Sequence, residues 1–152
     1  MADPSLAGLA RRLAASQKTA ALSTLSQRVP GHPFGSVVQY ALDPAGLPIL
    51  LLSSLAMHAR NLAADPRSSL MIQESVPPDA ALVAARLTLV GEFHPVSEEG
   101  VRQTFLDRHP DAVQWVDFGD FSFYRFRLAD AYYVGGFGVM GWVSPAQYAG
   151  GA

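Results

Sequence analysis

The chain passes from an apolar strand into a short basic helix within the stretch Leu51-Leu-Ser-Ser-Leu-Ala-Met-His-Ala-Arg-Asn-Leu-Ala-Ala-Asp-Pro-Arg67. The continuous apolar run from Ile49 to Leu52 is typical of a buried strand. Ser53 and Ser54 are residues that commonly cap a helix, and good helix formers follow from Ala56 to Ala64, before an Asp-Pro pair that ends a helix. This order predicts a strand, a serine-capped turn and a short helix.

The first turn of such a helix carries backbone amides that no helical carbonyl can pair, and these amides form a natural binding site for an anion. His58 and Arg60 lie within the first two turns, where their side chains can add formal charge to the positive helix end. The stretch therefore predicts a phosphate site. The alternative is an ordinary capped helix on which both side chains point into solvent.

The composition is that of a globular domain without covalent or metal cross-links. With 152 residues, 49% of them hydrophobic, the chain can bury roughly 70% of the surface that its unfolded form exposes. Cysteine is absent, which excludes disulfides, thiolate metal sites and cysteine nucleophiles and suits the cytoplasm. The four histidines show no ligand spacing, so no metal site is expected.

Charge and hydropathy argue against two classes of partner. The net charge of -2 argues against nucleic acid, because binding to a phosphate backbone requires clustered basic charge. No apolar run is long enough to cross a bilayer, and Arg11-Arg12 lies inside an amphipathic stretch rather than ahead of an apolar core. We therefore expect a cytoplasmic protein with no signal peptide, no membrane span and no nucleic-acid partner.

Alternating segments predict about six or seven short antiparallel strands with interleaved helices. Along residues 85–94 the apolar Leu87, Leu89 and Phe93 fall on one face, and along residues 121–128 aromatic residues alternate with arginines. A small barrel is expected, since closure removes exposed strand edges. The expected strands cover residues 19–25, 35–42, 49–52, 68–74, 85–94, 121–128 and 131–134, and the expected helices cover about 5–16, 56–64 and 97–109.

Four motifs carry a family resemblance through their order: Thr19-Ala-Ala-Leu-Ser-Thr-Leu25, Gly31-His-Pro-Phe-Gly-Ser-Val-Val38, the stretch from Ser53 to Asn61, and Arg86-Leu-Thr-Leu-Val-Gly91. The chain resembles the pyridoxamine 5'-phosphate oxidase-like superfamily of FMN-binding split barrels, and within it the haem-utilisation branch. The resemblance implies a mainly β (α+β) fold, a six- to seven-stranded antiparallel split β-barrel of the FMN-binding type with flanking helices. It also implies a single domain over residues 1–152, with an N-terminal helix at about 5–16 and a glycine-rich tail at about 135–152.

The resemblance implies a cofactor site with three groups of residues around FMN. The start of the short helix would hold the phosphate and the ribityl chain, and a loop backbone would run along the edge of the isoalloxazine ring. The implied residues are Ser54, His58, Arg60 and Asn61 at the phosphate, Ser53 near the ribityl chain, Phe34, Gly35 and Ser36 at the ring edge, and Thr24 and Arg86 as further contacts.

The sequence shows no catalytic constellation of its own. No Ser-His-Asp arrangement or carboxylate pair is evident, so the reactive group would be borrowed from a cofactor and the catalytic residues stay unidentified. The resemblance implies an FMN-dependent oxidoreductase acting on an unidentified small molecule. It further implies a homodimer with the flavin at the subunit interface, and the aromatic segment 121–133 offers apolar surface for such an interface.

Two alternatives stay open. The first is a protein that binds or degrades haem or another tetrapyrrole, with His32 as the candidate iron ligand, and the second is a flavin-free regulatory split barrel. Haem ranks below FMN as the expected ligand, because haem-utilising relatives commonly continue into a C-terminal domain, whereas this sequence ends at Ala152. In addition, some relatives carry a basic residue after a Gly-Phe-Gly segment, where this chain has Val139.

Overall fold

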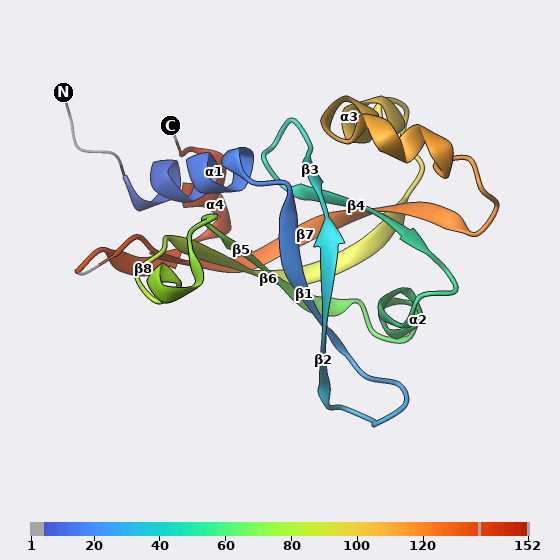
Figure 1. The fold of residues 1–152 in the computed structure, drawn as a ribbon, viewed down its shortest axis with the longest axis horizontal. Helices are drawn as coiled ribbons and strands as arrows, with labels where there is room; N and C mark the ends of the chain where they lie inside the picture. Colours follow the sequence, from blue (N-terminus) through green and yellow to red (C-terminus); the bar gives the residue numbers. More distant parts are fainter. Residues whose placement is uncertain (1–4, 137, 152) are drawn as a thin grey trace.

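The computed structural model describes residues 5–136 and 138–151 and consists of a curled antiparallel sheet with flanking helices (Figure 1). The predicted fold class, a mainly β split barrel, is confirmed. The strands are β1 (Thr19–Leu25), β2 (Pro33–Gln39), β3 (Ala41–Leu42), β4 (Pro48–Ser53), β5 (Arg67–Gln73), β6 (Arg86–Val96), β7 (Phe121–Val134) and β8 (Met140–Val143). The helices are α1 (Leu6–Ser16), α2 (Met57–Ala64), α3 (Val101–Arg108) and α4 (Pro145–Ala149), with 3-10 turns η1 (Pro78–Ala80) and η2 (Pro110–Gln114).

The sheet has eight strands rather than the expected six or seven. The strand expected at 35–42 is divided into β2 and the two-residue β3, and the four-residue β8 is too short for an alternating pattern to reveal. Conversely, the two closing strands expected at 121–128 and 131–134 are one continuous strand, β7. No helix within the described ranges is long and apolar enough to cross a membrane.

The two ends of the sheet are joined by the chain itself. Neighbouring strands follow the order β2-β1-β5-β6-β7-β4-β3, and β8 pairs with β7. β2 and β3 stand at opposite ends of this order, yet only Tyr40 separates them in the chain. This extended stretch pairs with β1 through its first part and with β4 through its last part. It therefore bridges the sheet where the barrel would otherwise be open.

The longest pairing joins β6, with 11 residues, to β7, with 14. The other edge of β7 is divided between β4, which pairs with its first residues, and β8, which pairs with its last. The register shifts between Val90 and Gly91, as at a β-bulge. A Cβ atom on Gly91 would overlap the carbonyl oxygen of Arg127, so the bulge requires glycine at this position.

The inner face of the barrel carries the apolar half of each alternating strand. Leu87, Leu89 and Phe93 on β6 are buried, as the alternation predicts, and Phe126 on β7 is buried beside them. The ring centroids of Phe93 and Phe126 are 4.6 Å apart. Alternation within each strand therefore decides which side chains form the core.

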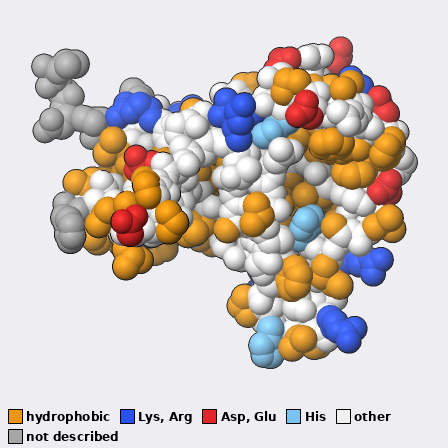
Figure 2. Space-filling view, viewed as in Figure 1, with side chains coloured by type: hydrophobic (Ala, Val, Ile, Leu, Met, Phe, Trp, Pro, Cys, Tyr) orange, Lys and Arg blue, Asp and Glu red, His pale blue; other side chains and the backbone are white. Residues whose placement is uncertain are grey.

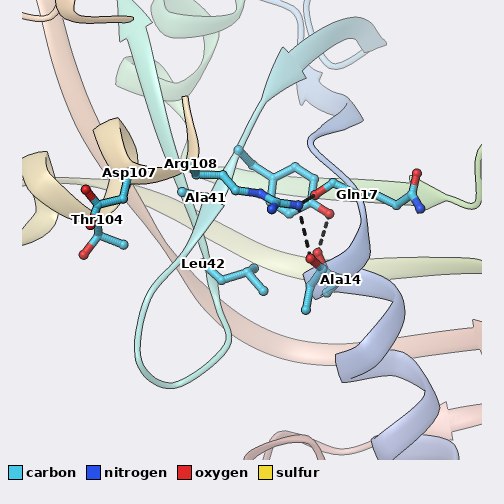
Figure 3. A pocket seen from close by; sticks show the side chains of 9 residues that line it. Ala14, Gln17, Ala41, Leu42, Thr104, Asp107 and Arg108 are labelled. Carbon is cyan, nitrogen blue, oxygen red and sulfur yellow. Dashed lines mark hydrogen bonds between the residues drawn. The ribbon is translucent and has the colours of Figure 1, made fainter. Parts of the chain in front are cut away.

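The C-terminal end of α1 is anchored by side chains from the sheet and from α3, beside a cavity of about 350 Å³ (Figure 3). The Tyr40 hydroxyl donates to the Ala14 carbonyl at 2.6 Å, and the Arg108 guanidinium donates to the carbonyls of Ala15 and Gln17 at 3.2 and 3.0 Å. The helix itself leaves such terminal carbonyls without partners. Burial raises the pKa of Tyr40 far above its usual value, so its hydroxyl stays protonated and serves as a donor.

Two further segments differ from the sequence prediction. The third helix begins at Val101 rather than near residue 97, after Gly100 at a φ of 90°, a left-handed conformation that glycine adopts without strain. The expected glycine-rich tail contains β8 and α4, and Ser144 begins α4 with a reciprocal capping box. Phe137, at the centre of the Gly-Phe-Gly segment, lies outside the described residues.

We expect Gly91→Ala to lower the free energy of unfolding by about 1–3 kcal/mol, the usual cost of overpacking, because the added methyl group would overlap the β7 backbone. Gly119→Ala is the matched control, since nothing lies within 4 Å of a Cβ atom built there. Urea unfolding of the two variants measures the difference. Equal stabilities would contradict the tight approach of the strands at the bulge.

Candidate functional site

Asn61 ties α2 to the sheet. Its Nδ2 donates to Thr24 Oγ1 on β1 at 3.0 Å, and its Oδ1 accepts from the backbone amide of Gln27 at 3.0 Å. Asn61 is fully buried and Thr24 is also buried. Both predicted site residues therefore have their polar groups occupied within the fold, and they hold α2 and the turn after β1 in fixed positions.

His58 faces β2 from the first turn of α2. Its Nδ1 lies 3.0 Å from Ser36 Oγ, so the structure brings together two of the predicted site residues. The side chain is half-buried, and this burial lowers the pKa of His58 from its usual value. The imidazole is therefore neutral at pH 7 and does not supply the cation that the predicted phosphate site requires.

Asp120 accepts hydrogen bonds from Ser53 and Ser54, the two residues that were expected to cap α2. Ser53 Oγ donates to the Asp120 carboxylate at 2.6 Å, and the Ser54 amide donates to the Asp120 carbonyl at 2.7 Å. α2 begins at Met57 after Ala56, with no side-chain cap, so the prediction of a serine-capped helix is wrong. The carboxylate at this turn also repels a phosphate, because like charges raise each other's energy at short range.

The remaining residues at the predicted ring edge lie on β2 beside His58. Phe34 pairs with Thr24 and Gly35 pairs with Ser23 in the antiparallel register with β1. Phe34 and Ser36 are two residues apart on the strand, so their side chains share a face and lie about 7 Å apart. Phe34 is half-buried and lies on the face of β2 that carries Ser36, the partner of His58.

Arg86 lies apart from this group. Its guanidinium donates to the carbonyls of Leu82 and Ala84 at 3.2 and 3.4 Å, in the loop before β6. Strand pairing places Thr24 opposite Ser68, and Ser68 opposite Gly91 on β6. Gly91 lies five residues along β6 from Arg86. At the rise of an extended strand this separation is about 17 Å. The structure therefore does not bring Arg86 to the site with the other predicted residues.

Exposed apolar side chains surround the start of α2. Leu55 and Met57 are exposed on the turn and at the helix start, and Phe118 is exposed on the neighbouring loop. The hydrogen bond between Ser54 and Asp120 holds that loop beside the turn. We call Phe34, Leu55, Met57, His58 and Phe118 the α2 surface. Sequence reasoning missed Phe118 and Asp120, because they lie more than 50 residues from α2 and no spacing connects them to it.

Two exposed arginines flank the α2 surface. Arg60 lies on α2, and Arg28 lies on the turn that Asn61 holds in place through Gln27. Figure 2 shows charged side chains of both signs in small, separate groups on the face that it draws. Arg60 and Arg28 each add a local positive charge at these positions.

The outer face of the sheet carries a second exposed surface. Strand pairing places one row of side chains across six strands, and Val37, Met71 and Trp142 in this row are exposed. The rings of Tyr132 and Trp142 contact each other, with centroids 4.9 Å apart. We call this row the outer row, and it consists of Val37, Ala21, Met71, Thr88, Tyr132 and Trp142.

Comparison with known families and proteins gives two matches. A family model described as CREG, beta-barrel matches residues 3–150. The chain is 47% identical over 118 residues to the chloroplastic haem oxygenase HOZ of Arabidopsis thaliana, a match that covers 76% of this chain and 36% of that protein. The chain therefore spans only about a third of the length of this relative.

Solved structures match over most of the chain. The haem binding protein from Mycobacterium smegmatis superposes with a TM-score of 0.90 at 35% identity, covering 99% of this chain and 62% of that one. A second match is a protein from Clostridium acetobutylicum related to general stress protein 26, of the pyridoxinephosphate oxidase family. It superposes with a TM-score of 0.71 at 14% identity and covers 97% of this chain and 99% of that one. The second match concerns the fold alone and agrees with the predicted split-barrel fold.

The prediction of FMN as the cofactor is wrong. HOZ, at 47% identity, and the M. smegmatis protein, at 35%, are named for haem and not for FMN. Two local features agree with this correction: His58 does not supply the expected cation, and the Asp120 carboxylate lies at the turn before α2.

We expect Asn61→Ala to destabilise the protein by about 1–3 kcal/mol, because the change leaves a buried hydroxyl and a backbone amide without partners. Thr24→Val removes the other side of the same contact, so the double variant should lose less stability than the sum of the two single variants. Denaturant unfolding of all four proteins measures this coupling. Additive losses would show that the two side chains act independently.

Proposed function

The chain belongs to the CREG β-barrel family, and from this premise we propose that it binds haem on the α2 surface. Two relatives support the proposal by name, the haem oxygenase HOZ at 47% identity and the M. smegmatis haem binding protein at 35%. Haem, which the sequence placed after FMN, is thus the better-supported ligand. Because the chain spans 36% and 62% of these proteins, the haem chemistry of their full lengths enters here only as a proposal.

The observation that carries the proposal is the exposed apolar cluster around a half-buried histidine. Haem is a flat apolar ring with an iron at its centre and two carboxylates at its edge, so it needs apolar contact, a nitrogen ligand and nearby cations. Leu55, Met57 and Phe118 offer the apolar contact, and His58 offers a neutral imidazole. Arg28 and Arg60 supply the cations, so the residues present fit the group.

The chain's own residues would bind and orient the haem, and the iron would supply the redox chemistry. Phe34 on β2 and Leu55 on the turn before α2 would offer apolar contacts to the ring. Asn61 and Asp120 keep these contacts in register, because they fix α2 and its preceding turn to the sheet. The protein would thereby present a preformed surface with little reordering on binding.

Haem degradation is a second candidate, favoured by the 47% identity to the haem oxygenase HOZ. Val139, which stands where some haem-utilising relatives carry a basic residue, is exposed and close to β8. Degradation is separable from binding by adding an electron donor to the haem-loaded protein in the presence of catalase. A decay of the haem band with formation of a biliverdin-like product distinguishes degradation from simple storage or transport.

We further propose that a second copy of the chain covers the outer row. A large exposed apolar surface usually marks an interface, and this row, with exposed Val37, Met71 and Trp142, extends across six strands. The neighbouring register positions Arg67, Glu92 and Arg127 alternate in charge across three strands. About a two-fold axis, Glu92 of each copy can meet an arginine of the other copy.

We expect ferric haem added to the protein to give a saturable change in the Soret band. Leu55→Asp should weaken haem binding about tenfold or more, since burial of a leucine side chain contributes about 1.5–3 kcal/mol. Leu82→Asp is the control, because Leu82 is 90% exposed, against 70% for Leu55, and lies on the loop before β6. A wild-type protein without a saturable change refutes haem binding, and equal affinities of the two variants refute its location.

Sedimentation should show a dimer at micromolar concentration for the wild type and a monomer for Val37→Asp, because the variant places a charge in the outer row. Val37 is 79% exposed, so the substitution does not disturb the core. Val113→Asp, at a valine that is 61% exposed on η2, should leave the dimer intact. A monomeric wild type, or equal dissociation of both variants, would exclude the outer row as the interface.

A further inference from the structure

The four histidines differ in which ring nitrogen remains accessible. In a histidine side chain, Nδ1 is bonded to the ring carbon that carries Cβ, so the chain crowds a flat macrocycle approaching from that side. Nε2 lies at the far side of the ring and is the nitrogen that reaches a haem iron without this clash. A histidine that ligates haem therefore needs an available Nε2, with its Nδ1 held by another group.

Two of the histidines use Nε2 within the fold. His109 is buried, and its Nε2 lies 2.7 Å from the Tyr40 carbonyl. The Nε2 of His94 lies 2.8 Å from the Glu92 carboxylate, which accepts hydrogen bonds and leaves only the hindered Nδ1. Neither residue presents Nε2 to a ligand.

His32 lies on the exposed turn between β1 and β2. Its Nδ1 is 3.4 Å from the Pro30 carbonyl, which is at the long limit of a hydrogen bond. The ring is therefore weakly oriented, and a ligand would have to immobilise it at a cost in side-chain entropy. Its exposed position on the turn also gives it less contact with the rest of the fold than a half-buried side chain has.

His58 has the opposite arrangement. Its Nδ1 lies 3.0 Å from Ser36 Oγ, and a hydroxyl oxygen can accept a hydrogen bond from this nitrogen. With the proton on Nδ1, the lone pair is on Nε2. The ring is half-buried between α2 and β2, so its orientation is set before any ligand arrives.

We propose that His58 Nε2 is the axial ligand of the haem iron and that the Ser36 hydroxyl positions the ring through Nδ1. This inference rests on the proposed haem-binding function and names the ligand within the α2 surface. Phe34 lies on the same face of β2 as Ser36, and the exposed Leu55 precedes His58 by three residues, so both elements that hold the ring also carry apolar side chains. His58 replaces His32, the ligand that the sequence suggested.

The test is a titration of the full chain with ferric haem, followed by absorption and electron paramagnetic resonance spectra. Wild-type protein should show a histidine-ligated spectrum, and His58→Ala should lose that signature and bind haem more weakly than any other single histidine variant. Added imidazole should restore the signature in His58→Ala by occupying the vacated space. His32→Ala is the matched control and should keep the wild-type spectrum.

Ser36 is tested as a positioning residue. Ser36→Ala should weaken haem binding about tenfold, at the lower end of the usual effect of removing a group that orients a metal ligand. Ser36→Thr keeps the hydroxyl and should restore most of the affinity. Thermal unfolding monitored by circular dichroism shows whether each variant is folded, and imidazole rescue keeps the result interpretable if His58→Ala is destabilised.

The outcomes separate the two proposals. A wild-type protein that takes up no haem refutes the proposed function itself. A wild-type protein that binds haem while His58→Ala keeps the histidine-ligated spectrum overturns the assignment of His58 and leaves haem binding standing. Loss of the spectrum in His32→Ala instead would return the ligand to the β1–β2 turn.

Discussion

The antiparallel pairing of β6 with β7 is the constraint on which the remaining structure depends. β7 is long enough to pair with β6 on one edge and with both β4 and β8 on the other, while β6 carries β5 on its far side. The bulge at Gly91 lets this long pair bend, because bulged strands twist more strongly than regular ones. The stretch around Tyr40 then connects β1 to β4 and closes the sheet.

The position of the α2 surface follows from this closure. β4 leads into the turn before α2, where Asp120, from the loop ahead of β7, accepts hydrogen bonds from Ser53 and Ser54. Asn61 then ties α2 to β1, the strand that pairs with β2. α2 is thus fixed to both sides of the barrel, and His58 is directed at β2. The site is a consequence of how the two halves of the sheet are connected.

The change from FMN to haem as the favoured ligand shows how one helix start can suit different chemistry. An isolated helix N-terminus with a histidine and an arginine favours an anion. In the folded chain a carboxylate lies at the preceding turn, the histidine is neutral, and the nearby exposed side chains are apolar. Those tertiary features favour a largely apolar ring over a phosphate. The names of the two more similar relatives agree with that physical preference.

The sequence by itself determined where most of the strands lie, which of their side chains face the core, and that the fold is mainly β. Alternation in 85–94 and 121–128 encodes these features locally, since each strand residue faces the core or the solvent according to its parity. Only the tertiary structure decided the partners of the polar groups. His58 meets Ser36 across 22 residues, Asn61 meets Thr24 across 37, and Ser53 meets Asp120 across 67. A local pattern carries no information on such pairings, because strand register and the closure of the barrel set them.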